Sequence, residues 1–421
     1  MTHELVVWLN AQRVGRLFLQ HGRIAFQYDL QWLDSNTAFP ISHSLPLQEA
    51  VFDDRVSRPF FSGLLPEGEK RRLVAQALQV SRQNDFALLD GIGGECAGAV
   101  MFLEQDQIPP SNMSEQAVRW LDDDAIISLL NELPKRPMLA GQDGLRLSLA
   151  GAQDKLPVVL SQRRLGVPLH NTPSTHILKP VIQDIEGSVF NEGFCLALAQ
   201  ALKLSVARSQ IMTVQHQSFL LVERYDRQVM TDGALVRLHQ EDFCQALGIV
   251  PEYKYQNEGG PSLKQCFELI RQATRPNAPQ VLMMLDYVIF NALIGNHDAH
   301  GKNFSLLYNP NGVILAPLYD ALSTAVYPNL TVKMAMKLGS KYEFDQVYER
   351  HWLRFAEEAG LSPALVKKRV RNIASKLPRL AMQVKSQFEE KELANEILAK
   401  IVALIQVRCQ MTLDRLASLN S

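Results

Sequence analysis

The residues best suited to catalysis lie in one short segment, residues 296–303, in which six of eight side chains are polar. Asp298 supplies a carboxylate that can accept the proton of an attacking hydroxyl group. Asn303 follows five positions later, and Asp320 follows a short apolar strand. Both carry oxygen atoms of the kind that Mg²⁺ prefers, and Mg²⁺ needs only one or two carboxylates besides phosphate oxygens. This set of residues indicates phosphoryl transfer.

The order of these residues along the chain matches that in protein kinases. The spacing from Asp298 to Asn303 is that of the kinase catalytic loop, D-x-x-x-x-N, and Asp320 then occupies the position of the second metal-binding aspartate. Each residue also has a purely structural reading, since Asp298 can cap a helix and Asn303 and Asp320 suit turns. The order of the parts favours the catalytic reading.

Further parts of a nucleotide site are expected upstream. The turn 148–155 is rich in small residues, which allow backbone N–H groups to approach phosphate oxygens. Lys179 ends a predicted strand, as the phosphate-binding lysine of kinases does, and Glu192 on the next helix is placed to pair with it. The strand end 220–227 corresponds to the kinase hinge, although it also reads as an ordinary charged strand end.

These residues need a sheet-rich part followed by a helical part to position them. Runs of β-prone residues at 5–8, 14–19 and 24–28 predict an antiparallel meander, and helical spacing predicts short helices between 59 and 88. Glycines at 91–98 precede a strand, so we interpret them as a tight turn. The polar stretch 104–118 reads as a linker.

Beyond the linker, the sequence predicts a strand from Arg146, a turn at Gly151 and further strands at 156–160, 175–179, 209–214 and 218–223. Helices are expected at 191–202 and 281–294, the latter buried on almost every face and ending at Gly295. The predicted fold class is therefore α+β, protein-kinase-like and two-lobed. The expected domains are 1–110 (an N-terminal β-rich subdomain), 111–235 (a kinase small lobe) and 236–421 (a helical large lobe).

Composition restricts the function classes. The 421 residues carry 43 basic and 44 acidic side chains, a net charge of −1, which excludes bulk attraction to nucleic acid or anionic membrane. Five cysteines, an odd number at least 22 residues apart, fit neither a disulfide framework nor a CxxC zinc site. Without a secretory N-terminus or a run of 18 apolar residues, we expect a cytoplasmic protein. The sequence does contain one local basic run: residues 361–388 carry seven basic and no acidic side chains.

Together these segments resemble a known family. The similarity is carried by Ser148–Lys155, Thr175–Lys179, Val222–Arg227, Arg237–Asp242, Tyr255–Pro261 and Asp298–Asn303, with Phe60–Gly68 in the N-terminal part. In this order they closely resemble the HipA family, the serine/threonine-protein kinase toxins of bacterial type II toxin–antitoxin modules. The resemblance covers nearly the whole chain.

The resemblance implies roles at the matching positions. Asp298 would be the catalytic base, Ser148 the autophosphorylated serine, and Asn303 and Asp320 the Mg²⁺ ligands. Modification of Ser148 would expel the phosphate loop and switch the kinase off. The residues implied to contact ATP are Ala150, Gly151, Ala152, Gln153, Asp154, Lys155, Lys179, Glu223, Arg224, Tyr225, His300, Gly301, Lys302, Asn303, Tyr319 and Asp320.

The resemblance also implies partners. These are a small DNA-binding antitoxin of the HipB type, DNA through the antitoxin complex, and a protein substrate such as an aminoacyl-tRNA synthetase. No membrane partner is implied.

Three other readings compete. His297-Asp298 could belong to a metal-dependent phosphohydrolase, but that fold needs more histidines upstream, and none lies between His239 and His297. A small-molecule kinase of the aminoglycoside or choline type shares the lobe plan but not the N-terminal meander or the Ser148 loop. A non-catalytic scaffold or co-repressor that bridges antitoxin and DNA would account for the basic run 361–388, but it has no need of the complete catalytic set.

Overall fold

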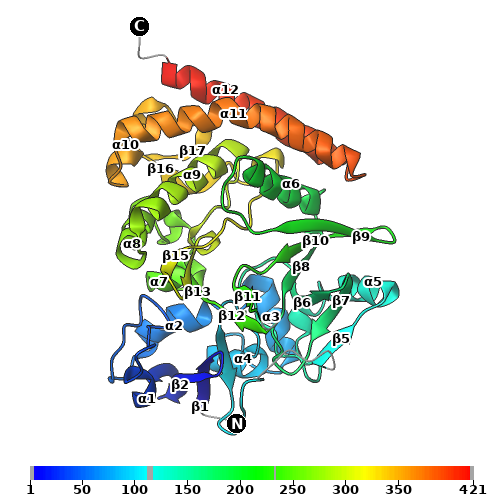
Figure 1. Cartoon of the computed structure of the whole chain (residues 1–421), viewed down its shortest axis with the longest axis vertical. Helices are drawn as coiled ribbons and strands as arrows, with labels where there is room; N and C mark the ends of the chain where they lie inside the picture. The colour runs from blue at the N-terminus through cyan, green and yellow to red at the C-terminus, as the bar shows by residue number, and fades with distance from the viewer. Residues whose placement is uncertain (1–3, 111–116, 232–233, 418–421) are drawn as a thin grey trace. The chain divides into compact units, whose positions relative to one another are not determined.

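The computed structural model describes residues 4–110, 117–231 and 234–417, and Figure 1 shows its helices and strands. The chain divides into two units. Unit 1 comprises Met1–Pro180, Met212–Glu252 and Leu307–Pro310, and unit 2 comprises the segments Val181–Ile211, Tyr253–Leu306 and Asn311–Ser421. Both strands and helices are abundant, which confirms the α+β class. The three predicted domains stay a prediction, and residues 111–116 of the expected linker lie outside the described residues.

Unit 1 begins with the predicted meander, which is confirmed. Three strands and a later fourth form an antiparallel sheet in the order β3-β2-β1-β4. Short helices follow the meander, as helical spacing predicted. The elements are β1 (Glu4–Leu9), β2 (Gln12–Gln20), β3 (Arg23–Tyr28), α1 (Leu30–Leu33), α2 (Asp54–Ser62), α3 (Gly68–Ala77), α4 (Asp85–Ile92) and β4 (Val100–Leu103).

The core of this sheet is aromatic. The ring of Phe61 packs against Phe26, Phe60 and Phe102, with centroid distances of 5.3, 5.2 and 5.8 Å. All four rings are fully buried. Because Phe60 and Phe61 come from α2 and the other two from strands, burial of these rings fixes α2 on the sheet.

The rest of unit 1 is built on a six-stranded sheet in the order β5-β7-β6-β8-β10-β9. It has its own core, formed by buried residues between Ile126 and Leu221. The elements are β5 (Val118–Trp120), α5 (Asp123–Glu132), β6 (Leu156–Ser161), β7 (Arg164–Pro168), β8 (His176–Pro180), β9 (Ser209–Val214), β10 (Gln217–Glu223), β11 (Arg227–Val229), β12 (Leu235–Arg237), β13 (His239–Asp242) and α7 (Phe243–Ala246).

The strand predicted from Arg146 is wrong. This segment forms only two isolated parallel bridges, Glu95 with Leu147 and Pro66 with Gly151. The alternating leucines are real core residues, since Leu147 and Leu149 are 2% and 4% exposed. The alternation of leucines therefore reflects which side chains are buried. The backbone of this segment pairs with single residues of the N-terminal part and does not form a strand.

Unit 2 is mainly helical. Helix α11 packs against α12, α10, α6 and α9, and the predicted helix at 191–202 corresponds to α6. The elements of unit 2, with β14 continuing into the 307–310 segment of unit 1, are α6 (Ser188–Ala201), α8 (Leu263–Ala273), α9 (Asn277–Ile294), β14 (Ser305–Asn309), β15 (Gly312–Leu315), β16 (Lys333–Leu338), β17 (Lys341–Glu343), α10 (Glu349–Glu358), α11 (Pro363–Glu390) and α12 (Glu396–Ala417).

Helix α9 directly precedes the predicted catalytic segment. It ends at Gly295 as predicted, with φ of 75°, a left-handed conformation that glycine adopts without steric cost. Among the described residues, α9 is also the one helix long and apolar enough to cross a membrane by length and composition. However, 61% of it is buried inside the protein, as in a core helix.

A buried carboxylate in unit 1 ties the segment after the meander to β13. Glu241 accepts hydrogen bonds from Ser42 Oγ at 2.5 Å, the His43 amide at 2.9 Å and Tyr308 Oη at 2.5 Å. Burial raises the pKa of Glu241 from 4.5 to about 7, although these hydrogen bonds oppose the rise. The folded protein therefore holds a proton that the unfolded chain releases between pH 4.5 and about 7.

We expect Glu241 to make stability depend on pH. Its contribution is fully present below about pH 4.5 and is lost as the pH rises to about 7. Glu241→Gln stays neutral, so its free energy of unfolding relative to wild type should rise by up to roughly 3 kcal/mol between pH 4.5 and 8. Urea unfolding at several pH values measures this, with exposed Glu252→Gln as control. A difference that does not change with pH would contradict the expectation.

Candidate functional site

The predicted catalytic segment, residues 296–303, is a loop in unit 2 that follows α9 directly. Asn303 Nδ2 donates to the carbonyl oxygen of Asp298 at 2.8 Å, and the His300 amide donates to the same oxygen at 2.8 Å. The Asn296 side chain accepts from the Asp298 amide at 3.1 Å. The backbone of Asp298 is therefore held from three sides, while Asp298 itself is exposed.

The carboxylate of Asp298 has a partner that the sequence did not reveal. Tyr255 Oη donates to Asp298 Oδ1 at 2.7 Å. The Tyr255 ring also contacts the ring of His300 edge-on, with centroids 5.2 Å apart. Tyr255 lies in a segment that carries the family resemblance, but nothing in its spacing links it to a residue 43 positions away. It orients the carboxylate through Oδ1 and leaves the second oxygen, Oδ2, outside this hydrogen bond.

Asp320 lies in the same unit and has an unusual backbone. Its φ is 51°, in the left-handed region that residues other than glycine seldom adopt, although aspartate tolerates it better than most. Asn296 Nδ2 donates to the carbonyl oxygen of Asp320 at 3.4 Å. Strained backbone conformations of this kind cluster at functional sites, and Asp320 is a predicted metal ligand.

Tyr319 and Lys302 are joined as well. Tyr319 Oη donates to the carbonyl oxygen of Lys302 at 2.8 Å, and it lies 2.6 Å from Ser305 Oγ. His300, Lys302 and Asn303 are buried, with 5%, 7% and 9% of their surface exposed. The structure thus brings together, within unit 2, the predicted residues Asp298, His300, Lys302, Asn303 and Tyr319.

The predicted phosphate loop lies in unit 1 and is ordered against the N-terminal part. Ser148 is fully buried, and its Oγ donates to the carbonyl oxygen of Leu64 at 2.8 Å. The Glu67 amide donates to the carbonyl oxygen of Gly151 at 3.1 Å. Gly151 has φ of 107°, a conformation that a side chain would strain, which explains glycine at this point of the loop.

Lys179 is buried in the same unit. It lies on β8 opposite Leu220 of β10, with 4% of its surface exposed. Its burial excludes the interpretation of Lys179 as an ordinary surface lysine. Glu192, its predicted partner, lies buried on α6 in unit 2. The pairing of Lys179 with Glu192 stays a prediction.

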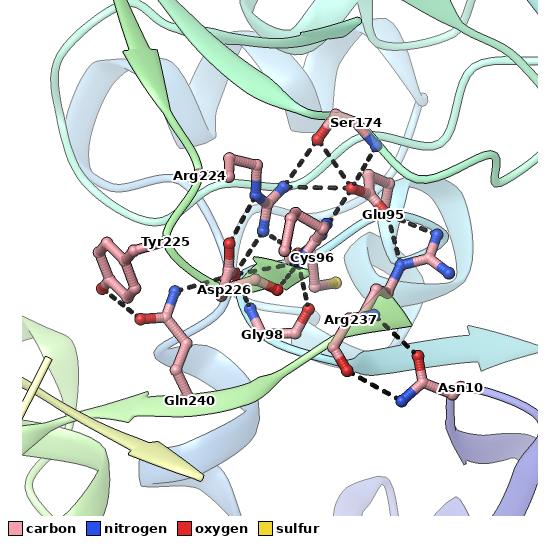
Figure 2. Close-up of polar contacts among 11 residues, drawn as sticks. Asn10, Glu95, Cys96, Gly98, Ser174, Arg224, Tyr225, Asp226, Arg237 and Gln240 are labelled. Atoms are coloured by element: carbon pink, nitrogen blue, oxygen red, sulfur yellow. Dashed lines mark hydrogen bonds and ion pairs between the residues drawn. The ribbon is translucent and has the colours of Figure 1, made fainter. Parts of the chain in front are cut away.

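The hinge segment holds a buried ion cluster. The Arg224 guanidinium contacts Glu95 at 3.1 Å and Asp226 at 2.7 Å, as Figure 2 shows, and its exposed fraction is 1%. Arg227 and Arg237 contact the two oxygens of Glu95 at 2.7 and 2.6 Å. Ser174 adds hydrogen bonds to Glu95 from its amide at 2.9 Å and its hydroxyl at 2.8 Å.

The cluster already engages the side chain of Arg224, one of the predicted hinge residues. Arg224 Nε, Nη1 and Nη2 all donate within the cluster, so any contact of Arg224 with a nucleotide would have to use the main chain. Glu223 is exposed. Half-buried Tyr225 is joined to the cluster, because its Oη donates to Gln240 Oε1 and Gln240 Nε2 donates to Asp226 Oδ2 at 3.2 Å (Figure 2). Burial alone would raise the pKa of Glu95, but the charges of Arg227, Arg237 and Arg224 hold it well below its usual range.

The basic run at the C-terminus lies on α11, and part of its charge is already neutralised. Lys367 pairs with Glu349 at 2.6 Å, Arg369 pairs with Asp286 at 2.9 Å, and Lys385 pairs with Glu389. The other four basic residues are exposed: Lys368, Arg371, Lys376 and Arg379.

The fold and these loops are those of a kinase-like protein. A sequence model of the HipA-like C-terminal domain matches residues 147–381, and one of the HipA N-terminal domain matches residues 5–103. The chain belongs to the HipA family, as the sequence predicted.

Relatives support this assignment along most of the chain. The putative kinase Y4mE of Sinorhizobium fredii is 49% identical over 373 residues, which cover 88% of this chain and 89% of that protein. The serine/threonine-protein kinase toxin HipA of Shewanella oneidensis is 30% identical over 372 residues, covering 86% and 84%. A solved structure of Shewanella oneidensis HipA with HipB and operator DNA aligns with a TM-score of 0.85, 27% identity and 99% coverage of both chains.

Proposed function

We propose that this protein is a serine/threonine-protein kinase that transfers the γ-phosphoryl group of ATP to a protein hydroxyl group. The observation that carries the proposal is the loop after α9, in which an exposed Asp298 carboxylate is oriented by Tyr255 at 2.7 Å and its backbone is fixed by Asn303 at 2.8 Å. In the transfer, the hydroxyl oxygen bonds to the γ-phosphorus, the bond to the bridging oxygen of ADP breaks, and the hydroxyl proton passes to Asp298.

The residues present fit Mg²⁺. Because Asn303 Nδ2 donates to the carbonyl oxygen of Asp298, the side-chain oxygen Oδ1 is the atom left to meet a cation. Asp320 supplies a hard carboxylate from a left-handed backbone. When bound, Mg²⁺ would neutralise charge on the phosphate oxygens. Asn303 and Asp320 would hold it.

Contacts with the nucleotide are also part of the proposal. In our proposal the loop from Ala150 to Lys155 covers the phosphates, Lys179 neutralises their charge, and Glu223 and Tyr225 lie near the adenine. The ordered loop and the buried position of Lys179 support these roles. The contacts that Arg224, His300, Gly301, Lys302 and Tyr319 make with ATP are proposed on the family resemblance.

Ser148 is the proposed site of self-modification. Its hydroxyl group is fully buried and donates to Leu64. A phosphoserine cannot donate this hydrogen bond, and its negative charge would face a carbonyl oxygen, so the modified loop would leave its place. Autophosphorylation would therefore switch the kinase off.

We propose partners of the kind that the relatives have. The Shewanella oneidensis HipA structure contains HipB and operator DNA, and an antitoxin of the HipB type would link this chain to DNA. The four exposed basic residues of α11 would face phosphate groups. A cytoplasmic location and an aminoacyl-tRNA synthetase as substrate are proposed with it.

Dependence on metal tests the kinase proposal. Purified protein incubated with ATP labelled in its γ-phosphate should incorporate label in proportion to Mg²⁺ occupancy, and Asp320→Asn should need at least about tenfold more Mg²⁺ for half the maximal rate. Asp414→Asn, an exposed change on α12, is the control. Label that is independent of Mg²⁺ would contradict the assignment, and bound ATP without any transfer would favour a scaffold.

A further inference from the structure

The phosphate loop of unit 1 is fastened to a seven-residue segment of the N-terminal part, Leu64 to Lys70. Three contacts join them: Ser148 Oγ to the Leu64 carbonyl oxygen at 2.8 Å, the Glu67 amide to the Gly151 carbonyl oxygen at 3.1 Å, and Lys70 Nζ to Asp154 Oδ2 at 2.6 Å. The contacts occur at the start, middle and end of the loop. The segment therefore holds the loop along its length.

Lys70 occupies a position that its own helix disfavours. It lies in the first turn of α3, which begins at Gly68. Positive charge at a helix N-terminus opposes the helix dipole, which favours acidic residues there. An acidic partner offsets this unfavourable position, and Asp154 is that partner, with side chains of Lys70 and Asp154 that are only 19% and 14% exposed.

Asp154 places a negative charge in the predicted phosphate loop. A carboxylate in a loop that approaches ATP would repel the phosphate groups. Among the described residues, Asp154 Oδ1 is buried without a hydrogen-bond partner, so the ion pair with Lys70 is the contact that compensates this charge. The pair thus neutralises the acid and anchors the end of the loop at once.

From these contacts we propose that Lys70 is a positioning residue for ATP. The segment Leu64 to Lys70 acts as a latch that keeps the phosphate loop in its binding conformation, and Lys70 closes the latch through Asp154. The proposal rests on the proposed kinase function for its consequence. The latch itself is a property of the fold, and it can be measured without phosphoryl transfer.

Hydrogen–deuterium exchange of the full-length protein without nucleotide tests the latch. In Lys70→Met, backbone amides of residues 148–155 should exchange about tenfold faster than in wild type, the size expected when one charge-assisted hydrogen bond is lost. The matched control is Arg72→Met on the same helix, because Arg72 pairs with Glu69 on the surface, where the side chains are 48% and 61% exposed. Unchanged exchange in Lys70→Met, or an equal increase in Arg72→Met, would overturn the proposal.

A double-mutant cycle tests whether the pair is responsible. Asp154→Asn should accelerate loop exchange as Lys70→Met does, and the double variant should exchange no faster than either single variant. Additive effects would show that Lys70 and Asp154 act separately and would overturn the ion-pair latch.

The kinetic test separates positioning from chemistry. In Lys70→Met, the ATP concentration for half-maximal label incorporation should rise about tenfold, while the rate at saturating ATP should stay within about twofold of wild type. Equal affinity for ATP, or a loss confined to the maximal rate, would overturn the positioning role. If wild type itself transfers no phosphate, the kinase function fails, but the exchange experiment still decides the latch.

Discussion

Replacing Asp298 with asparagine should lower the rate of phosphoryl transfer by at least about 10³-fold, because a general base contributes a factor of this order. The amide group keeps the size of the side chain and can still meet Tyr255, which contacts Oδ1 at 2.7 Å in the wild type. The loop is also held through the backbone of Asp298, so it should keep its fold. Single-turnover transfer from γ-labelled ATP measures the effect.

Two controls make this result specific. ATP binding, measured by calorimetry, should change little in Asp298→Asn, since the proposed ATP contacts are made by other residues. The exposed Asp414→Asn variant should transfer phosphate at the wild-type rate. A transfer rate in Asp298→Asn that is close to wild type would remove Asp298 from the catalytic role.

Replacing Glu95 with glutamine should lower the free energy of unfolding by about 3–5 kcal/mol, the range seen when one partner of a buried ion pair is removed. Glu95 is fully buried among Arg224, Arg227 and Arg237, and Asp226 would then be the remaining acid of the cluster. The variant leaves three arginine charges with one acidic partner. Urea unfolding at pH 7 measures the loss.

The pH dependence of this loss has a definite sign. Because the pKa of Glu95 is held well below its usual range in the folded protein, its contribution is present above the unfolded pKa of 4.5 and declines as the pH falls. The difference between wild type and Glu95→Gln should therefore narrow in acid. Glu69→Gln, which removes an exposed pair with Arg72, is the control and should lower the free energy of unfolding far less than Glu95→Gln does. Equal stability of Glu95→Gln and wild type would contradict this account of the cluster.

Local sequence patterns predicted many of the individual elements. The meander at residues 5–28 consists of runs of β-prone residues, and α9 is apolar on almost every face up to Gly295, so both could be read from the sequence. The predicted catalytic loop also depends on near neighbours, since Asp298 and Asn303 are close in sequence and contact each other. These features depend on neighbours within a few residues.

Contacts between distant residues could not be predicted. Lys70 and Asp154 are 84 positions apart, and Glu95 and Arg224 are 129 apart, so neither pair leaves a periodic signal. The sequence predicted Arg224 as part of a nucleotide-binding strand end. It could not show that the side chain is buried, because the sequence does not distinguish a buried arginine from an exposed one. The leucines around Ser148 suggested a strand, although they only mark which side of the loop is buried.

The measurement that tests the central claim most directly is the mapping of the phosphorylated residue. Phosphatase-treated protein is incubated with Mg²⁺ and ATP labelled in its γ-phosphate, and peptides are then analysed by mass spectrometry. The proposed kinase predicts label on Ser148 in wild type and none in Asp298→Asn. Label at Ser148 in both proteins, or no label in wild type with ATP bound, would contradict a kinase in which Asp298 acts as the base.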